Sequence, residues 1–291
     1  MILLLLKTIY GLKQAAYEYW LVLLKAMQKV GLLRNKADPC VYYRWTNNGL
    51  NIWSSWVDDI LSAGDKKDVG QGREALKDHF ELNEVGDLQE YVRCKVDYDR
   101  EKGTMVLTQP VLIQSFEDKF NLEEYGNRIP NTPASPNTTL MEGETKLGTE
   151  KHHKYCKGVG KMIHLSKYSR PDILNAVQEL LRHGAHPMEA HYTAMIQCMK
   201  YVVNTKDTGF KIIPHGIWDG QDKNFEFVIM GKSDSNFAQD AKTRHSISGY
   251  AAYLNGVTYM SKSQMQKFIP PASQKRNVSL VVTVFRTCCM E

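Results

Sequence analysis

The amino-acid sequence predicts an α+β fold, in which antiparallel sheets carry helices. One observation is that short apolar and aromatic runs come in pairs around turn residues: CVYYRW and LNIWSSW flank TNNG, a β-hairpin pattern. A second is that apolar residues recur elsewhere at helical spacing, as in AAYEYWLVLLKAMQKVG, where Gly31 ends the pattern. With 291 residues and 43% hydrophobic content, the chain can form the cores of one large or two ordinary domains.

Hairpins and helices follow one another through residues 1–125. The second strand of the first hairpin runs directly into VDDI, and ILSA continues beyond it, which predicts a strand, an aspartate-bearing turn and a strand. A helix is expected across KDVGQGREALKDHF, and a second hairpin in YVRCKVDYD and TMVLTQ. A further helix is expected from Pro110 to Phe120, with the proline in its first turn.

Residues 126–150 are rich in Pro, Asn, Thr and Gly, so we expect an extended linker and a domain boundary here. Beyond the linker the sequence predicts two helices, over Asp172–His183 and Pro187–Asn204. The remainder is expected to form strands, in GFKIIP, FEFVIMGKSD, SGYAAYLNG and VTYMSK.

The chain lacks the sequence features of a secreted or membrane protein. The opening MILLLLK is too short for a signal-peptide core, and no later stretch has the roughly 18 consecutive apolar residues of a membrane span. We therefore expect a soluble, intracellular protein, cytoplasmic or nuclear, with no membrane partner. The six cysteines show no C-x-x-C spacing, which favours reduced thiols over zinc ligands or disulfides.

Charge is distributed unevenly along a chain whose net charge is +5. Residues 1–44 hold seven Lys and Arg against two acids, whereas residues 45–102 hold eight bases against thirteen acids. A basic segment beside an acidic pair fits a polyanion-binding surface next to a metal site. Because many soluble proteins are mildly basic, an ordinary solvated surface is the alternative.

Asp58 and Asp59 interrupt an apolar stretch that otherwise reads as strand. On a regular strand the two side chains would point to opposite faces, but in a tight turn both can reach one region. Carboxylates held in this way can bind the two magnesium ions that phosphoryl transfer commonly uses. The alternative is a solvated hairpin turn without a metal.

Three histidines, His183, His186 and His191, lie in RHGAHPMEAH. Pro187 between them breaks any single helical face, which favours structural or surface histidines over a metal site.

The order of several motifs resembles the reverse transcriptase of copia-type retrotransposons. IYGLKQA is followed by NKADPCVYY and then by WVDDI, and the resemblance covers almost the whole chain through EVGDLQEYV, LTQPVLIQSF, NTP, SRPDI, PMEAHYTAMIQCMKYV and SDSNFAQDAKTRHSISGY. It implies a partial polymerase palm and thumb over 1–125 and the linker over 126–150. A helical connection over 151–208 and an incomplete ribonuclease H-like α/β domain over 209–291 would follow.

The resemblance implies a polymerase site in the first half. WVDDI matches the family's polymerase hairpin, usually YVDD, so Asp58 is the expected magnesium ligand and Asp59 its partner, with Trp56 at the usual tyrosine position. GLKQ matches the segment beside the incoming nucleotide and template. Gln14 is therefore the expected contact there, with Lys13 nearby.

The resemblance also identifies DLQEYVRCKV with the family's primer-gripping hairpin. Arg93 stands at the position where the family has glycine, a departure that bears on how a primer would be held.

In the second half, SDSNFAQD is similar to the opening of the family's ribonuclease H domain, SDADWAGD. This implies that Asp234 is its first metal-binding carboxylate. The family's glutamate lies in a stretch resembling LSSTEAE, whereas this chain reads NVSLVVTVFRTCCME at the comparable place. The nuclease site is therefore expected to be incomplete.

Polymerase activity of this chain alone is not expected. The family's first catalytic aspartate lies in a stretch resembling DVKTAFLNG, upstream of YGLKQ, and the hairpin by itself supplies only two of three carboxylates. The implied cofactor is Mg²⁺, and the implied partners are an RNA or DNA template-primer and deoxynucleoside triphosphates. Two alternatives are a non-catalytic nucleic-acid-binding remnant and a chain that never folds stably.

Overall fold

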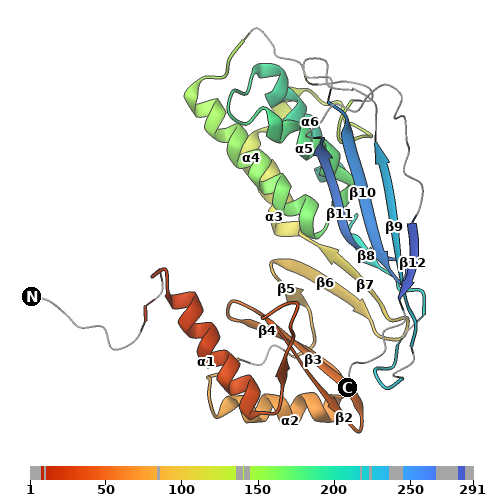
Figure 1. The fold of residues 1–291 in the computed structure, drawn as a ribbon. Coiled ribbons are helices and arrows are strands. Elements are labelled where there is room, and N and C mark those ends of the chain that lie inside the picture. The colour runs from red at the N-terminus through yellow and green to blue at the C-terminus, as the bar shows by residue number, and fades with distance from the viewer. Residues whose placement is uncertain are drawn as a thin grey trace, which may run out of the picture. The chain divides into compact units, whose positions relative to one another are not determined.

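The computed structural model describes residues 8–9, 11–83, 86–135, 140, 145–216, 218–222, 225–235 and 245–266, together with the backbone of 281–285. The chain divides into two compact units (Figure 1). Unit 1 takes its described residues from Met1–Asp87 and Trp218–Phe225, and unit 2 from Leu88–Ile217 and Glu226–Arg286. Both contain helices and antiparallel sheets, which confirms the α+β class. Across the described ranges, no helix combines the length and apolar character that crossing a membrane requires.

A four-stranded antiparallel sheet forms the centre of unit 1. Its strands lie in chain order: β1 (Leu33–Arg34), β2 (Val41–Thr46), β3 (Gly49–Trp56) and β4 (Asp59–Ala63). Every second residue of β3 is buried, which is the alternation expected of a sheet covered on one face. Both predicted hairpins of this sheet are confirmed.

Two helices cover that face, α1 (Ala15–Lys29) and α2 (Lys66–Lys77). The Asp65 side chain begins α2 by accepting hydrogen bonds from the N–H groups of Lys67 (3.0 Å) and Asp68 (3.2 Å). The helices and the sheet share one buried apolar cluster: Leu23, Ala26, Met27, Leu32, Tyr42, Trp53 and Leu76.

A short segment far along the chain completes unit 1. The N–H of Leu50 donates to Gly220 O at 2.8 Å, and the rings of Trp45 and Trp218 meet edge to face with centroids 6.3 Å apart. Gly49, with a φ of 113°, permits this approach, because a Cβ there would lie 2.6 Å from Gly220 O. Residues 218–222 therefore pack on the β2–β3 hairpin.

Unit 2 begins with a second antiparallel sheet, in the order β5 (Glu90–Tyr91), β6 (Cys94–Asp99), β7 (Thr104–Thr108) and β8 (Phe210–Ile212). The hairpin of β6 and β7 was predicted. Its pairing with β8 joins segments that are distant in the sequence.

Among the described residues of unit 2, four helices follow: α3 (Pro110–Phe120), α4 (Thr149–Tyr168), α5 (Leu174–Arg182) and α6 (Glu189–Asn204), with short 3₁₀ turns at Leu122–Tyr125 and Pro171–Ile173. They share a large apolar core that includes Phe116, Tyr155, Met162, Met195 and Met199. In Figure 1, α3 (yellow) and α4 (green) run beside each other.

The helix α4 lies in the stretch 151–208 that the resemblance implies to be helical, but its bounds were not predicted. Its lysines, histidines and glycines hide the apolar pattern, although Tyr155, Val159, Met162 and Leu165 do recur at helical spacing and are buried. Gly158 lets α6 approach closely, since a Cβ there would lie 2.6 Å from Met195 Sδ.

A buried arginine links the turn after α4 to the end of α6. Arg170 is fully buried; its guanidinium donates to both carboxylate oxygens of Asp172 (2.9 and 2.8 Å) and to the carbonyl oxygen of Thr205 (3.1 Å). The Asp172 carboxylate also accepts from the Tyr201 hydroxyl at 3.0 Å. The hydrogen bonds of this salt bridge thus connect the turn after α4 to α6.

The last sheet is antiparallel in the order β11 (Val257–Met265), β10 (Ile247–Leu254), β9 (Phe227–Ser235) and β12 (Val281–Phe285). Helix α5 packs on β11, where the Ser263 hydroxyl donates to Asn175 Oδ1 at 3.0 Å. The predicted strands β8 to β11 are confirmed, while the four predicted domain ranges and the ribonuclease H-like character of 209–291 stay predictions.

Candidate functional site

The two adjacent aspartates lie at the tip of the β3–β4 hairpin. Trp56 pairs with Asp59, so Val57 and Asp58 form a two-residue turn. Val57 has a φ of 54°, a left-handed conformation that is strained for a β-branched residue. Both carboxylates are exposed to solvent. The predicted strand, aspartate turn and strand are confirmed.

Helix α1 packs against this hairpin through Tyr19. Burial and the nearby negative charge of Asp58 together raise the pKa of the Tyr19 phenol. The Tyr19 ring also lies against Phe80, with centroids 6.2 Å apart, and packs on the same core as Ile60 of β4. Tyr19 of α1 therefore lies close to the aspartate turn.

Lys13 and Gln14 lie in the turn that leads into α1. The N–H of Ala15 donates to Leu12 O at 3.1 Å, and that of Glu18 donates to Gln14 O at 3.0 Å. Both side chains are exposed, and Gln14 does not cap the helix with its own side chain. They stand roughly 7–9 Å along the helix axis from Tyr19, the residue close to Asp58. The helix α1 that follows these two residues and the strand β4 that follows the aspartate turn pack on the same core of unit 1.

The donor set at the hairpin matches magnesium in type but not in number. Carboxylate oxygens are the ligands that Mg²⁺ prefers. Within the described residues, however, no group of three or more His, Cys, Asp or Glu side chains is gathered closely enough to hold a metal ion. Asp58 and Asp59 therefore do not form a complete site by themselves.

Asp234 lies near the end of β9 in unit 2, where it pairs with Gly249 of β10. Its side chain is exposed, and Oδ1 accepts the N–H of Ser235 at 2.8 Å. Gly249 pairs in turn with Ser263, the residue that contacts α5, so Asp234 lies on the sheet face that α5 covers. The segment NVSLVVTVFRTCCME, which is comparable to the one that carries the family's glutamate, lies outside the described residues, apart from the backbone of β12.

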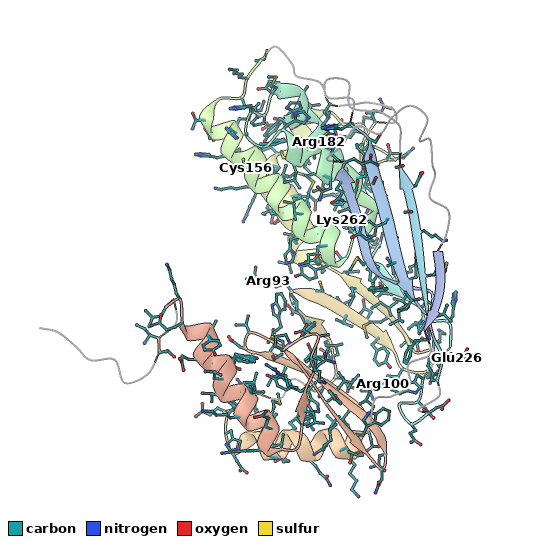
Figure 2. The ribbon with its side chains drawn as sticks, viewed as in Figure 1. Arg93, Arg100, Cys156, Arg182, Glu226 and Lys262 are labelled. Carbon is teal, nitrogen blue, oxygen red and sulfur yellow. The ribbon has the colours of Figure 1, made fainter. Side chains whose placement is uncertain are left out.

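Arg93 lies in the turn between β5 and β6, where Figure 2 labels it. It has a φ of 61° and follows Val92 at 50°. This left-handed conformation is one that glycine adopts readily and arginine does not. This backbone conformation explains the glycine that the family resemblance leads us to expect here. Arg93 adopts the same conformation and adds a charged side chain.

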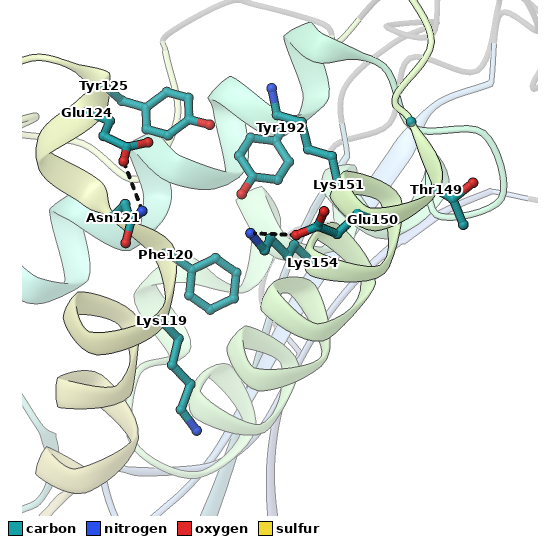
Figure 3. Close-up of a pocket in the computed structure, with 11 residues that line it drawn as sticks. Lys119, Phe120, Asn121, Glu124, Tyr125, Thr149, Glu150, Lys151, Lys154 and Tyr192 are labelled. Atoms are coloured by element: carbon teal, nitrogen blue, oxygen red, sulfur yellow. Dashed lines mark hydrogen bonds and ion pairs between the residues drawn. The ribbon is translucent and has the colours of Figure 1, made fainter.

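A polar pocket of about 540 Å³ opens between the end of α3 and the start of α4 (Figure 3). Three lysines line it, together with the rings of Phe120, Tyr125 and Tyr192: Lys119, Lys151 and Lys154. Two acids also line it, Glu124, which accepts from Asn121 Nδ2 at 2.9 Å, and Glu150, which pairs with Lys154 at 3.2 Å. The sequence does not indicate this pocket, because its lining comes from segments that only the tertiary fold brings together.

The three histidines of RHGAHPMEAH do not form a metal site in the described structure. The Nδ1 atom of His191 accepts the N–H of Met188 at 3.0 Å and so caps α6, and its ring stacks on that of His183 with centroids 3.8 Å apart. The structural interpretation of His183 and His191 is confirmed.

Comparison with known proteins decides the family. The family described as "Reverse transcriptase (RNA-dependent DNA polymerase)" matches residues 2–133, a range that contains both α1 and the aspartate hairpin. The Retrovirus-related Pol polyprotein from transposon TNT 1-94 of Nicotiana tabacum is 26% identical over 277 residues, which cover 90% of this chain. The chain belongs to the reverse transcriptase family of copia-type Pol polyproteins.

Two further relatives extend the similarity beyond the segment that defines the reverse transcriptase family. The Retrovirus-related Pol polyprotein from transposon RE2 of Arabidopsis thaliana is 26% identical over 89% of this chain and 17% of its own length. The putative transposon Ty5-1 protein of Saccharomyces cerevisiae is 22% identical over 94% of this chain and 86% of its own length. No solved structure matches the chain.

The chain spans about a fifth of the reverse transcriptase polyproteins that it matches, 19% in the case of the tobacco protein. Its similarity to these polyproteins nevertheless runs through both units. The resemblance to copia-type reverse transcriptases that the sequence motifs indicated is therefore confirmed. The roles of single residues stay predictions.

Proposed function

We propose that this chain is a segment of a copia-type reverse transcriptase that retains the palm's aspartate hairpin but does not polymerise DNA by itself. The observation that carries the proposal is the β3–β4 turn, which presents Asp58 and Asp59 beside α1 with no third carboxylate gathered there among the described residues. The family's reaction is RNA-directed DNA synthesis, and reverse transcriptases generally use divalent metals.

Within this proposal Asp58 and Asp59 are ligands for Mg²⁺, and Lys13 and Gln14 face template and nucleotide. The matching motifs support these roles, as does the packing of α1 on the hairpin through Tyr19. Such enzymes depend on positioning and charge stabilisation for nearly all their catalysis, so an incomplete ligand set removes most of the activity.

A primer-extension assay tests the proposal. The purified chain is incubated with a homopolymer RNA template, a DNA primer, Mg²⁺ and the complementary nucleotide, beside an intact retroviral enzyme as positive control. We expect no incorporation above the blank. Incorporation that disappears in Asp58→Ala but persists in Glu81→Gln, a matched loss of an exposed acid on unit 1, would overturn the claim of inactivity.

We propose further that residues 209–291 belong to an incomplete ribonuclease H-like domain whose first carboxylate is Asp234. Its place on the helix-covered face of an antiparallel sheet supports this proposal. Release of fragments from an RNA–DNA hybrid that Asp234→Asn abolishes would show that the nuclease site is complete after all.

The second candidate function is nucleic-acid binding without catalysis. The basic character of residues 1–44 favours it. Filter binding across a salt series separates this candidate from a chain with no nucleic-acid role, because phosphate contacts give a steep dependence of affinity on salt. Absence of binding at low salt would exclude it.

A further inference from the structure

The sequence contains two Asn-Gly pairs, and each lies at the tip of a β-hairpin. Asn48 and Gly49 lie where β2 turns into β3, and Asn255 and Gly256 lie where β10 turns into β11. An asparagine followed by glycine can modify itself, because the glycine has no side chain to shield its backbone nitrogen from the asparagine carboxamide. The surroundings of each pair decide whether this reaction takes place in the folded chain.

The Asn255 side chain is held in place on both sides. Asn255 is 8% exposed; its Oδ1 atom accepts the N–H of Val228 at 2.7 Å, and its own backbone N–H donates to Val228 O at 2.8 Å. The ring of His215 covers Gly256, since a Cβ built there would lie 2.7 Å from His215 Cε1. Turning the Asn255 carboxamide toward the Gly256 nitrogen would break a buried hydrogen bond. The fold therefore protects this pair.

The Asn48 side chain, in contrast, is exposed. Within the described residues its carboxamide makes one hydrogen bond, in which Nδ2 donates to Asp68 Oδ2 at 3.3 Å. The same oxygen also accepts the Thr46 hydroxyl at 2.5 Å and Asn51 Nδ2 at 3.5 Å. Because a long hydrogen bond of an exposed side chain exchanges readily with water, the Asn48 carboxamide can turn toward Gly49 at little cost.

We propose that Asn48 is a self-modification site, at which the side-chain amide is lost and the product is aspartate or isoaspartate. The Gly49 nitrogen gives its proton to water and attacks Cγ of Asn48, so that a cyclic succinimide forms. The bond from Cγ to Nδ2 breaks, and this nitrogen takes up a proton and leaves as ammonia. Water then adds to either ring carbonyl and reopens the ring, which gives the α-linked aspartate or the β-linked isoaspartate. Water is the co-reactant, and no atom is oxidised or reduced.

The product places a negative charge beside Asp68. Asp68 is 7% exposed and lies in the first turn of α2, so its hydrogen bonds with Thr46 and Asn51 connect this helix to the β2–β3 hairpin. Where the Asn48 amide donates at 3.3 Å, the product presents a carboxylate that has no proton to donate. Two carboxylates at this separation repel each other, and they do so more strongly where one of them is buried. Deamidation is therefore expected to weaken the contact between α2 and the hairpin.

Isoaspartate also changes the backbone, because the chain then runs through the side-chain Cβ and Cγ atoms of residue 48 and becomes longer there. Gly49 leaves little room for this change: a Cβ on it would lie 2.6 Å from Gly220 O, the oxygen that accepts the N–H of Leu50 at 2.8 Å. We therefore expect the modification to displace residues 218–222 from the β2–β3 hairpin. Such an irreversible mark of molecular age is separate from the polymerase and nucleic-acid roles proposed above.

Peptide mass spectrometry of the full chain tests the proposal. The protein is incubated at neutral and at mildly alkaline pH in water enriched in heavy oxygen, and the peptides that contain Asn48 and Asn255 are compared over time. Isoaspartate is recognised by its separate chromatographic elution and by methylation with an isoaspartyl methyltransferase. We expect conversion to be about tenfold faster at Asn48 or more, the factor that breaking one buried hydrogen bond imposes at Asn255. The product should carry heavy oxygen, and the rate should rise with pH because the attacking nitrogen must lose its proton.

Two controls accompany this experiment. In guanidinium chloride, where the chain is unfolded, the two Asn-Gly pairs should react at similar rates. Asn48→Gln should stop the reaction at the hairpin in the folded chain, because the longer side chain forms a cyclic imide far more slowly.

Two substitutions test the structural consequence. Asn48→Asp reproduces the charge of the product, and Asn47→Asp adds the same charge to the neighbouring exposed residue of the same turn. We expect Asn48→Asp to lower the ratio of folded to unfolded chain about tenfold in urea unfolding, because Asp68 loses a donor and gains a like charge. Asn47→Asp is expected to change this ratio much less.

Other results would overturn the proposal. No conversion at Asn48 in the folded chain, or equal rates at Asn48 and Asn255, would show that the hairpin protects Asn48 as well. A difference in rate that persists in the unfolded chain would assign it to the local sequence instead of the hydrogen bonds of Asn255. Equal stabilities of Asn48→Asp and Asn47→Asp would refute the connection through Asp68.

Discussion

Gly72 of α2 lies directly against the indole ring of Trp53 on β3: a Cβ built on this glycine would come within 2.8 Å of Trp53 Cζ2. The absence of a side chain at position 72 thus sets the distance between helix and sheet in unit 1. Gly70 on the same helix has nothing within 4 Å of the corresponding position.

We predict that Gly72→Ala destabilises the protein by roughly 1–3 kcal/mol, because the methyl group overpacks the helix–sheet interface. Gly70→Ala is the matched control and is expected to stabilise it by about 0.5–1 kcal/mol through helix propensity. Urea unfolding measures both. Equal effects of the two substitutions would show that α2 does not pack on Trp53 in this way.

The salt bridge between Arg170 and Asp172 predicts a loss of stability in acid. Burial opposes ionisation of Asp172, but the hydrogen bonds and charge of Arg170 outweigh it and hold the carboxyl's pKa below its ordinary value of 3.8. The stabilisation is therefore complete above about pH 4 and is lost as the pH falls through the lowered pKa.

Asp172→Asn is expected to cost about 3 kcal/mol at neutral pH, because it leaves a buried guanidinium without its counter-charge, and to flatten the acid dependence of stability. Asp207→Asn, an exposed acid beyond α6, provides the control. Thermal melts from neutral to acidic pH follow both variants. Parallel pH profiles for parent and Asp172→Asn would contradict the assignment.

The left-handed backbone of Arg93 predicts that glycine is the more stable residue there. Arg93→Gly is expected to raise the free energy of unfolding by about 1 kcal/mol, because glycine adopts a φ of 61° without steric conflict. Lys95→Gly, an exposed position inside β6, is expected to lower it by roughly 0.5–1 kcal/mol. If Arg93→Gly also destabilises, the turn conformation described for residues 92–93 is wrong.

Cysteine reactivity should follow burial. Burial raises the pKa of Cys94 to about 11 and that of Cys198 to about 12, whereas Cys156 is exposed on α4 (Figure 2). A pKa of about 11 leaves roughly a hundredfold less reactive thiolate than the ordinary value of 9.0. Alkylation followed by peptide mass spectrometry should label Cys156 first and Cys94 and Cys198 only after unfolding. Early labelling of Cys198 would show that the helical core of unit 2 opens readily.

The parts of the fold that sequence could predict are those with local signals. The aspartate turn follows from two strand patterns that leave Val57 and Asp58 between them, and α1 from its apolar spacing. For α4 the resemblance implied a helical connection, but its bounds were not predicted because lysines and histidines outnumber its core residues, although the spacing from Tyr155 to Leu165 was available.

Contacts between segments that are distant in the chain leave no signal in the local sequence. Nothing near Trp218 indicates that its ring meets Trp45, or that Gly220 accepts from Leu50. The candidate site divides in the same way: Asp58 and Asp59 were found from their pattern, while the position of Tyr19 close to Asp58 depends on tertiary packing.

The packing of residues 218–222 on the β2–β3 hairpin has a consequence for how the chain is made. During translation the first hairpin leaves the ribosome long before its covering segment exists, and all of 88–217 must be synthesised in the interval. Until residues 218–222 are made, the side of the hairpin that they cover, with the Trp45 ring and the Leu50 N–H, is exposed to solvent in the nascent chain. Unit 1 is therefore finished late, although most of it is made first.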